Sequence, residues 1–275
     1  MSVSTEDFLY ISTMVRNEAA IVLEEGKEYL VESRLNPLVK AEGLSSIADL
    51  VIKLKENGVW PLKRKVVEAL TTNETLFFRD LDPFEAIKAQ VLPAIIAKRQ
   101  HEKMITIWSA ACSSGQEAYS LAILIRDNFP QLNDWNVRIL ATDICSPVME
   151  KGRKGEYSQV EVNRGLPANC LIRHFNKVGL IWKVKDYLSN MVEFKEFNLV
   201  SSDWNQLPTF DLVLLRNVLI YFTADTKKQI LEKVRGVLGQ NGCLFLGAAE
   251  TTLGIDPAYE RAVHGKASYY CPIQS

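Results

Sequence analysis

Polar side chains that could hold a charged ligand stand at the ends of apolar runs in this sequence. Residues 109–115, Ser-Ala-Ala-Cys-Ser-Ser-Gly, follow one such run, and their small side chains would let a ligand approach the backbone beside a helix N-terminus. Asp143 ends the next run, where an acidic residue commonly accepts hydrogen bonds from ribose hydroxyls. Because the turn has neither a GxGxxG pattern nor a P-loop lysine, S-adenosylmethionine (SAM) is favoured over NAD.

Two further stretches are rich in polar groups. Arg216, Asn217 and Tyr221 follow the apolar run 210–215, and residues 71–80 place hydrogen-bonding groups before paired aromatic residues. Plainer explanations stay open for all of these features. The first turn could be an ordinary tight turn, Asp143 could cap the next helix, Tyr221 could be a core tyrosine, and 71–80 could be a capped linker.

The first part of the chain carries helical patterns only. Residues 1–70 repeat apolar side chains at helical spacing, and Ser46 with Asp49 predicts a capping box. Pro37 interrupts one apolar stripe, so we expect a kink or break there. A linker and joining helix follow over 71–103, with Asp82 as the expected N-cap.

From residue 104 to 275, apolar runs alternate with helical patterns. The expected strands are 105–110, 137–142, 210–215, 243–247 and, at the edge, 267–271. This alternation predicts an α/β fold with a parallel, doubly wound, Rossmann-like sheet that binds ligands at the carboxyl ends of its strands. The runs 180–184 and 192–197 do not fit the alternation and predict a small antiparallel insertion at about 175–198.

Composition excludes several classes of protein. Hydrophobic residues make up 47% and charged residues 24%, which excludes wholesale disorder, and the net charge of −1 argues against binding nucleic acid by bulk electrostatics. There is no apolar run long enough for a membrane helix and no secretion signal at the N-terminus. The five scattered cysteines fit reduced thiols in a cytosol, and the three separated histidines predict no metal site.

Four stretches in a fixed order carry a resemblance to a known family. They are Thr-Asn-Glu-Thr-Leu-Phe-Phe-Arg-Asp (72–80), Trp-Ser-Ala-Ala-Cys-Ser-Ser-Gly-Gln-Glu-Ala-Tyr-Ser (108–120), Ala-Thr-Asp-Ile (141–144) and Arg-Asn-Val-Leu-Ile-Tyr-Phe (216–222). Together they resemble the CheR-type chemotaxis receptor methyltransferases, which esterify chemoreceptor glutamates with SAM. The resemblance implies a SAM methyltransferase domain over 104–275 behind a helical, receptor-facing domain over 1–70.

The resemblance also implies roles for individual residues. Glu117 would bind the methionine end of SAM, Asp143 the ribose, and Tyr221 would face the target glutamate. Arg79 would lie nearest the transferred methyl group and, with Tyr221, make up the catalytic pair. The implied cofactor-binding residues are Asn73, Thr75, Arg79, Glu117, Asp143, Asn198, Leu199, Arg216 and Asn217. No metal is implied.

Partners and location follow from the same resemblance. We expect a cytoplasmic monomer recruited to membrane receptor arrays, acting on the receptors' cytoplasmic methylation helices and releasing S-adenosylhomocysteine (SAH). We expect no contact with nucleic acid and no membrane insertion. Residues 175–184 lack the longer, glycine-containing loop of members that dock on a receptor's C-terminal pentapeptide, so recognition is expected to be pentapeptide-independent. Two alternatives stay open: a SAM- or SAH-binding receptor adaptor without catalysis, and a SAM methyltransferase with another substrate.

Overall fold

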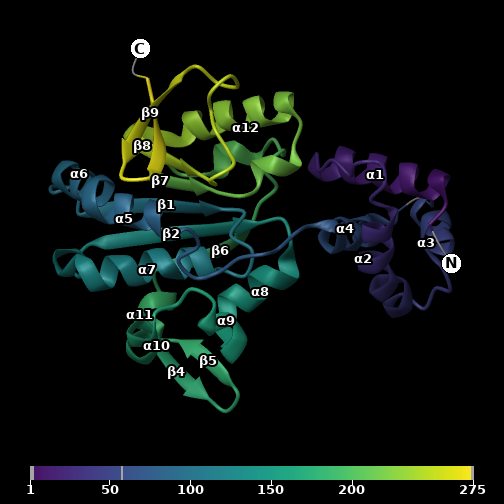
Figure 1. Cartoon of the computed structure of the whole chain (residues 1–275), viewed down its shortest axis with the longest axis horizontal. Helices are drawn as coiled ribbons and strands as arrows, with labels where there is room; N and C mark the ends of the chain where they lie inside the picture. The colour runs from purple at the N-terminus through teal and green to yellow at the C-terminus, as the bar shows by residue number, and fades with distance from the viewer. Residues whose placement is uncertain (1–2, 57, 274–275) are drawn as a thin grey trace. The chain divides into compact units, whose positions relative to one another are not determined.

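The computed structural model describes residues 3–56 and 58–273, which fall into two compact units (Figure 1). One unit contains the described residues up to Thr72 together with Tyr221–Thr226. The other contains Asn73–Ile220 and the described residues from Lys227 onward. Among the residues that the structure describes, none of the helices is long and apolar enough to cross a membrane.

The first unit is built from helices that bury one apolar stripe each. These helices are α1 (Thr5–Ala19), α2 (Glu28–Ala41), α3 (Ile47–Leu54) and α4 (Trp60–Leu70). The hydroxyl of Ser46 caps α3 by accepting the N–H of Asp49 at 3.1 Å, as the sequence predicts. Arg34 of α2 donates to the carbonyls of Leu70 and Thr71, which satisfies groups at the end of α4 that have no helical partner.

Of the kink or break expected at Pro37, the break is wrong, because α2 runs through this residue to Ala41. Leu35 and Val39 on either side of the proline are buried in the packed helices. Burial of these side chains outweighs the lost backbone hydrogen bond, so tertiary packing overrides the local preference of proline.

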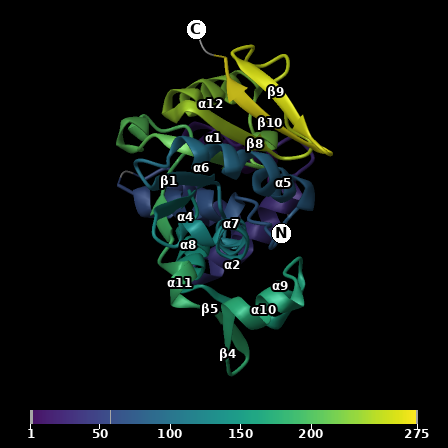
Figure 2. The ribbon, with the colours of Figure 1, turned by 90° about the vertical axis from the view of Figure 1, so that its left-hand side faces the viewer.

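A mostly parallel sheet forms the centre of the second unit (Figures 1 and 2). Its strands, in spatial order, are β6 (Val192–Glu196), β2 (Asn136–Asp143), β1 (Met104–Ala110), β7 (Phe210–Leu215), β8 (Leu238–Leu246), β10 (Ala267–Pro272) and β9 (Tyr259–His264). The chain proceeds from β1 outward to β2 and β6, then returns to β7 on the other side of β1. The switch point therefore lies between β1 and β7, where doubly wound sheets bind their ligands.

Helices and turns precede or connect these strands. They are α5 (Leu81–Ala86), the π-helical turn η1 (Ile87–Val91), α6 (Leu92–Lys98), α7 (Gln116–Asn128), η2 (Pro130–Leu132), α8 (Ser146–Lys154), η3 (Asp203–Gln206), η4 (Leu219–Tyr221) and α12 (Ala224–Val237). The inserted segment contains β3 (Glu156–Ser158), α9 (Gln159–Asn163), α10 (Ala168–His174), β4 (Phe175–Val178), β5 (Ile181–Val184) and α11 (Asp186–Ser189). Its antiparallel sheet, in the order β3-β5-β4, lies at the opposite end of the second unit from β9 and β10 (Figures 1 and 2).

Two strand predictions are wrong. The run 192–197 is not part of the antiparallel insertion, because β6 pairs in parallel with β2 in the main sheet, with Ile139 opposite Val192. The ring of Phe194 on this strand occupies space that the missing side chain of Gly152 leaves open. The run 267–271 is not an edge strand either, since β10 is covered by β9, which the sequence pattern did not predict.

Candidate functional site

A turn with unusual backbone conformations joins β1 to α7. Ala111, Ser113 and Gly115 all have positive φ, a region in which small or polar residues are accommodated most easily. The Ser113 hydroxyl donates to the carbonyl of Asn73 at 2.8 Å, and the carbonyl of Ser114 accepts the buried Tyr157 hydroxyl at 2.7 Å. The turn is thus held from two sides, at the carboxyl end of the central strand.

Asp143 ends β2 beside this turn, and its side chain is 7% exposed. One carboxylate oxygen accepts the N–H of Ser113 at 2.8 Å, and the other accepts the N–H of Cys145 at 2.9 Å. Burial raises the pKa of Asp143, and these backbone hydrogen bonds only partly counteract it. Because Asp143 accepts from the two segments that follow β1 and β2, it holds these segments together at the carboxyl ends of the strands.

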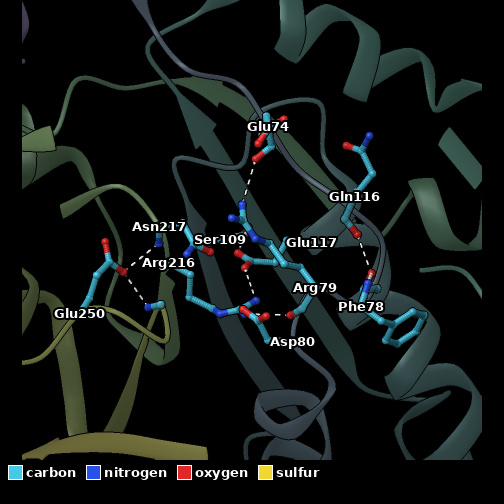
Figure 3. Close-up of polar contacts among 12 residues, drawn as sticks. Glu74, Phe78, Arg79, Asp80, Ser109, Gln116, Glu117, Arg216, Asn217 and Glu250 are labelled. Carbon is cyan, nitrogen blue, oxygen red and sulfur yellow. Dashed lines mark hydrogen bonds and ion pairs between the residues drawn. The ribbon is translucent and has the colours of Figure 1, made fainter. Parts of the chain in front are cut away.

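Arg216 follows β7 directly and lies between two carboxylates (Figure 3). Its guanidinium donates to Oε2 of Glu117 at 3.1 Å and to Oδ2 of Asp80 at 2.8 Å. The Arg216 side chain is 1% exposed, whereas those of Glu117 and Asp80 are 13% and 45% exposed. Ser109, on β1, donates to the second oxygen of Glu117 at 2.8 Å. The fold therefore joins β1, α7 and β7 through one charged network.

The role of Asp80 corrects the prediction for the joining helix. Asp80, not Asp82, occupies the N-cap position of α5, with a φ of 57° and no capping hydrogen bond from its side chain within the described residues. Its carboxylate instead accepts from Arg216, 136 positions away. The long-range ion pair thus takes the side chain that would otherwise cap the helix.

Residues 73–80, which precede α5, include three of the predicted site residues. Asn73 is tied to the turn through its carbonyl, and Thr75 is half-buried. Arg79 accepts from Arg216 through its backbone carbonyl at 2.8 Å, while its guanidinium donates to the carbonyl of Glu74 at 3.1 Å (Figure 3). The backbone carbonyl of Arg79 therefore joins the charged network, whereas its guanidinium bonds to the backbone of Glu74.

Asn198 and Leu199 lie just beyond β6. The N–H of Phe197 donates to the carbonyl of Asp143 at 3.0 Å, which brings the ends of β6 and β2 together. Asn198 accepts the N–H of Val200 through its side chain, and Leu199 is buried. These two residues follow the strand beside Asp143, on the far side of β2 from Glu117 and Arg216.

Glu250 is a prominent residue of this region that the sequence motifs did not indicate. Its Oε2 accepts the N–H of Asn217 at 2.7 Å and that of Gly247 at 2.6 Å (Figure 3). Asn217 has a φ of 60°, so Glu250 holds a left-handed turn directly after Arg216. The available signal was a Gly-Ala-Ala-Glu segment after a buried strand, a small-residue turn like that after β1.

Tyr221 belongs to the first unit. Its carbonyl accepts the N–H of Val22 at 3.1 Å, and its side chain is half-buried. The charged network around Arg216 lies in the second unit, so the role of Tyr221 stays a prediction from the resemblance.

A group of potential metal ligands escaped the spacing analysis. Among the described residues, Asp127, Cys170 and His174 bring ligand atoms within 4.8 Å of one another. Asp127 already accepts from Arg173 at 2.7 Å and from His174 at 3.0 Å, and the second ring nitrogen of His174 lies 2.6 Å from the hydroxyl of Tyr187. These contacts link α10 and α11 of the insertion to α7.

Comparison with known proteins covers nearly the whole chain. Residues 6–71 match the family model described as the all-alpha domain of CheR methyltransferase, and residues 73–267 match its SAM binding domain. The chain is 42% identical over 267 residues to chemotaxis protein methyltransferase 1 of Pseudomonas aeruginosa, and 40% identical over 265 residues to a chemotaxis protein methyltransferase of Pseudomonas putida. Each alignment covers 94% of this chain and 95% of the relative. A chemotaxis protein methyltransferase of Vibrio parahaemolyticus is 37% identical over 264 residues, with 94% of each chain covered. With both of its units matched in order, the chain belongs to the CheR methyltransferase family.

Proposed function

We propose that this protein transfers the methyl group of SAM to glutamate side chains of chemoreceptors, giving glutamyl methyl esters and SAH. The observation that carries the proposal is the gathering of Glu117, Asp143 and Arg216 beyond the carboxyl ends of adjacent parallel strands. Family membership and the names of the relatives support the choice of reaction and substrate.

The polar groups of the site fit SAM. The carboxylate of Asp143 accepts the N–H groups of Ser113 and Cys145, and a carboxylate has about four lone-pair sites, so it can also accept from a ribose hydroxyl. The ion-paired groups of Arg216, Glu117 and Asp80 carry one net negative charge, which suits a cationic ligand. The Nε of Arg216 is buried and meets no acceptor among the described residues.

We assign the remaining contacts by position. Glu117 would receive the ammonium group of SAM, and Asn198 with Leu199 would lie near the adenine. The other residues proposed to contact the cofactor are Asn73, Thr75, Arg79, Arg216 and Asn217. Of these residues, only Arg79 is also proposed to interact with the target carboxylate.

The chemistry asks little of acid–base groups on the protein. When bound, SAM supplies a methyl group that its own sulfonium activates. A glutamate has an unperturbed pKa of about 4.3, so the target is ionised at neutral pH without a general base. The tasks left to the protein are alignment of the two reactants and exclusion of water. We assign Tyr221 to hold one oxygen of the target carboxylate while the other attacks.

Arg79 is assigned to positioning. A tight bidentate pair between its guanidinium and the target would stabilise the carboxylate and lower its nucleophilicity. In the structure its Nη1 donates to the carbonyl of Glu74, a contact that keeps the guanidinium partly engaged. We therefore propose that Arg79 attracts the incoming carboxylate and contacts the cofactor without binding the nucleophile tightly.

Substrate recognition is proposed to be pentapeptide-independent. Strands β4 and β5 are joined by the two residues Gly179 and Leu180, so the connection is short. We propose that the protein acts as a monomer in the cytoplasm, at membrane receptor arrays, on the receptors' methylation helices. Basic residues on the helical unit could meet those helices, although acidic residues outnumber basic ones over 1–70. The basic candidates are Arg34, Lys40, Lys53, Lys55, Lys63, Arg64 and Lys65.

A methyl-transfer assay tests the proposal. The full chain, methyl-labelled SAM and a receptor cytoplasmic domain would be incubated and then treated with base, which releases methanol from a carboxyl methyl ester. Base-labile label confined to the receptor is expected. A receptor whose methylation-site glutamates are changed to alanine provides the control and should take up no base-labile label.

Other outcomes separate the alternatives. Bound SAH measured by calorimetry, without transfer to several receptors, would favour the non-catalytic adaptor. Transfer that does not depend on receptor helices would favour another substrate. Absence of both SAH binding and transfer would overturn the assignment of the cofactor.

A further inference from the structure

One carboxylate joins the ends of two neighbouring parallel strands in the second unit. Oε2 of Glu250 accepts the N–H of Asn217, beyond the end of β7, and the N–H of Gly247, beyond the end of β8. Its Oε1 accepts the N–H of Ile220 at 3.3 Å. Three backbone donors from two segments therefore converge on a single side chain.

The strand ends need such an acceptor. The ladder between β7 and β8 ends at the pair Leu215 and Leu246, after which the strands separate. Backbone N–H groups beyond that pair have no strand partner, and an unpaired buried N–H is costly. Glu250 replaces the lost ladder with charge-assisted hydrogen bonds, which are stronger than bonds between neutral groups.

The approach of the two strand ends to Glu250 is close enough to require glycine. A Cβ at Gly247 would lie 2.6 Å from Oε2 of Glu250 and 2.8 Å from the backbone nitrogen of Asn217. These distances are shorter than any comfortable carbon contact, so a larger residue would displace the carboxylate or the turn. The same geometry that brings Asn217 to Glu250 thus excludes a side chain at position 247.

The turn that Glu250 holds also sets the direction of Arg216. Asn217 is in the left-handed region, and the Arg216 side chain extends away from Glu250 toward Asp80 and Glu117 (Figure 3). Ile220, the third donor, immediately precedes Tyr221 in the chain. The backbone over 216–220 is therefore held at two of its N–H groups by a residue outside the charged network.

We propose that Glu250 is a positioning residue that holds residues 216–220 in the conformation needed for cofactor binding and methyl transfer. This inference rests on the proposed function. Glu250 acts through Arg216 and Asn217, and its carboxylate has no need to touch SAM or the target glutamate.

Substitutions at Glu250 provide the first test. Glu250→Ala removes all three acceptors, so the Kd for SAH measured by calorimetry on the full chain should rise about tenfold or more. Glu250→Gln keeps one oxygen for Asn217 and Gly247 and loses only the long bond to Ile220, so it should restore most of the affinity. Glu260→Gln, at an exposed position of β9, is the matched control and should bind SAH like the parent.

Glycine substitutions provide a second test that leaves the carboxylate in place. Gly247→Ala should push Glu250 from the turn and raise the Kd for SAH in the same direction as Glu250→Ala. Gly236→Ala is the control, because a Cβ at this position of α12 meets nothing within 4 Å. Thermal denaturation of each variant sets a temperature at which all of them are folded.

Hydrogen exchange separates positioning from a general loss of structure. In Glu250→Ala, exchange should accelerate in a peptide covering 216–221 and stay unchanged in one covering α7. Faster exchange with unchanged Kd and kcat would overturn the proposal, because the hydrogen bonds of Glu250 would then serve stability alone. Unchanged exchange would overturn it as well. If the parent protein did not bind SAH, the proposed function would be wrong, and the role of Glu250 in cofactor positioning would be wrong with it. The hydrogen-exchange data would still decide whether Glu250 holds the turn.

Discussion

Arg216 donates from Nη1 to Oε2 of Glu117 across 3.1 Å, and this bond connects the residue after β7 with the first turn of α7. Nη2 of the same guanidinium donates to the carboxylate of Asp80 and to the backbone carbonyl of Arg79. The fork shape of arginine allows these contacts at once, which the single ammonium of lysine could not reproduce. The pair therefore organises the strand ends as well as placing charge in the site.

Arg216→Met is expected to lower the free energy of unfolding by about 1–3 kcal/mol, since it leaves the partly buried carboxylate of Glu117 without its charged partner. Urea denaturation measures the change. Arg138→Met is the control, because Arg138 is exposed on β2 and its loss should change stability by less than about 0.5 kcal/mol.

A second substitution tests whether the loss of stability in Arg216→Met arises from the uncompensated carboxylate of Glu117. Adding Glu117→Gln to Arg216→Met should recover part of the lost stability, because the uncompensated carboxylate is then absent. Strictly additive losses in the double mutant would show that the two residues are not energetically coupled, against the geometry.

Asp143→Ala is expected to weaken SAH binding by about 1–3 kcal/mol, the range for a carboxylate that accepts hydrogen bonds from a ligand. Calorimetry on folded protein measures the change. Asp134→Ala, at an exposed position before β2, is the matched control. An affinity equal to that of the parent would remove Asp143 from the proposed site.

The raised pKa of Asp143 gives a pH dependence of defined sign. Burial places its folded-state pKa above the ordinary value of 3.8, so the folded state binds more protons than the unfolded state just above that pH. This group therefore costs stability as pH rises through its folded pKa and favours the fold as pH falls. The stability of the parent relative to Asp143→Asn, measured by urea titrations, should therefore grow as the pH falls toward 3.8. A shrinking difference would indicate a lowered pKa.

Gly152→Ala tests the placement of β6 in the main sheet. A Cβ at position 152 would lie 2.5 Å from the ring of Phe194, so overpacking should destabilise the protein by about 1–3 kcal/mol. Combining it with Phe194→Leu should relieve much of that cost. Gly236→Ala, with open space around it in α12, should leave stability unchanged or slightly raise it, because alanine favours a helix more than glycine does.

The strands that the sequence predicted well are those buried on both faces. The run 210–215 is β7 with the same bounds, and its residues are all buried. By contrast, β6 has no fully buried residue and β9 has only Tyr259, so their burial pattern does not distinguish them from loops or from an insertion. Which strand pairs with which depends on long-range packing that no local pattern reports.

The site shows the same division. The carboxylate after β2 and the polar residues after β7 could be placed at one sheet edge from their positions alone. The partners Asp80 and Glu250 could not, because Asp80 meets Arg216 across 136 positions and a capping role explains its sequence context equally well. Local sequence thus predicted which residues approach the site, and the tertiary fold decided which of them pair.

Tyr221→Phe tests the role proposed for the hydroxyl of Tyr221. If the hydroxyl holds one oxygen of the target carboxylate, its loss removes one hydrogen bond to a charged group and should lower kcat for receptor methylation by about tenfold. The Kd for SAH should stay near that of the parent. Tyr269→Phe on β10 is the control, since this ring is also half-buried but stacks on Phe245, outside the charged network. The backbone of Tyr221 bonds to Val22 through its carbonyl, which the substitution preserves, so the fold of the first unit should be unaffected. Equal losses in kcat and in SAH affinity would contradict the role, because a residue that touches only the target has no means of weakening the cofactor.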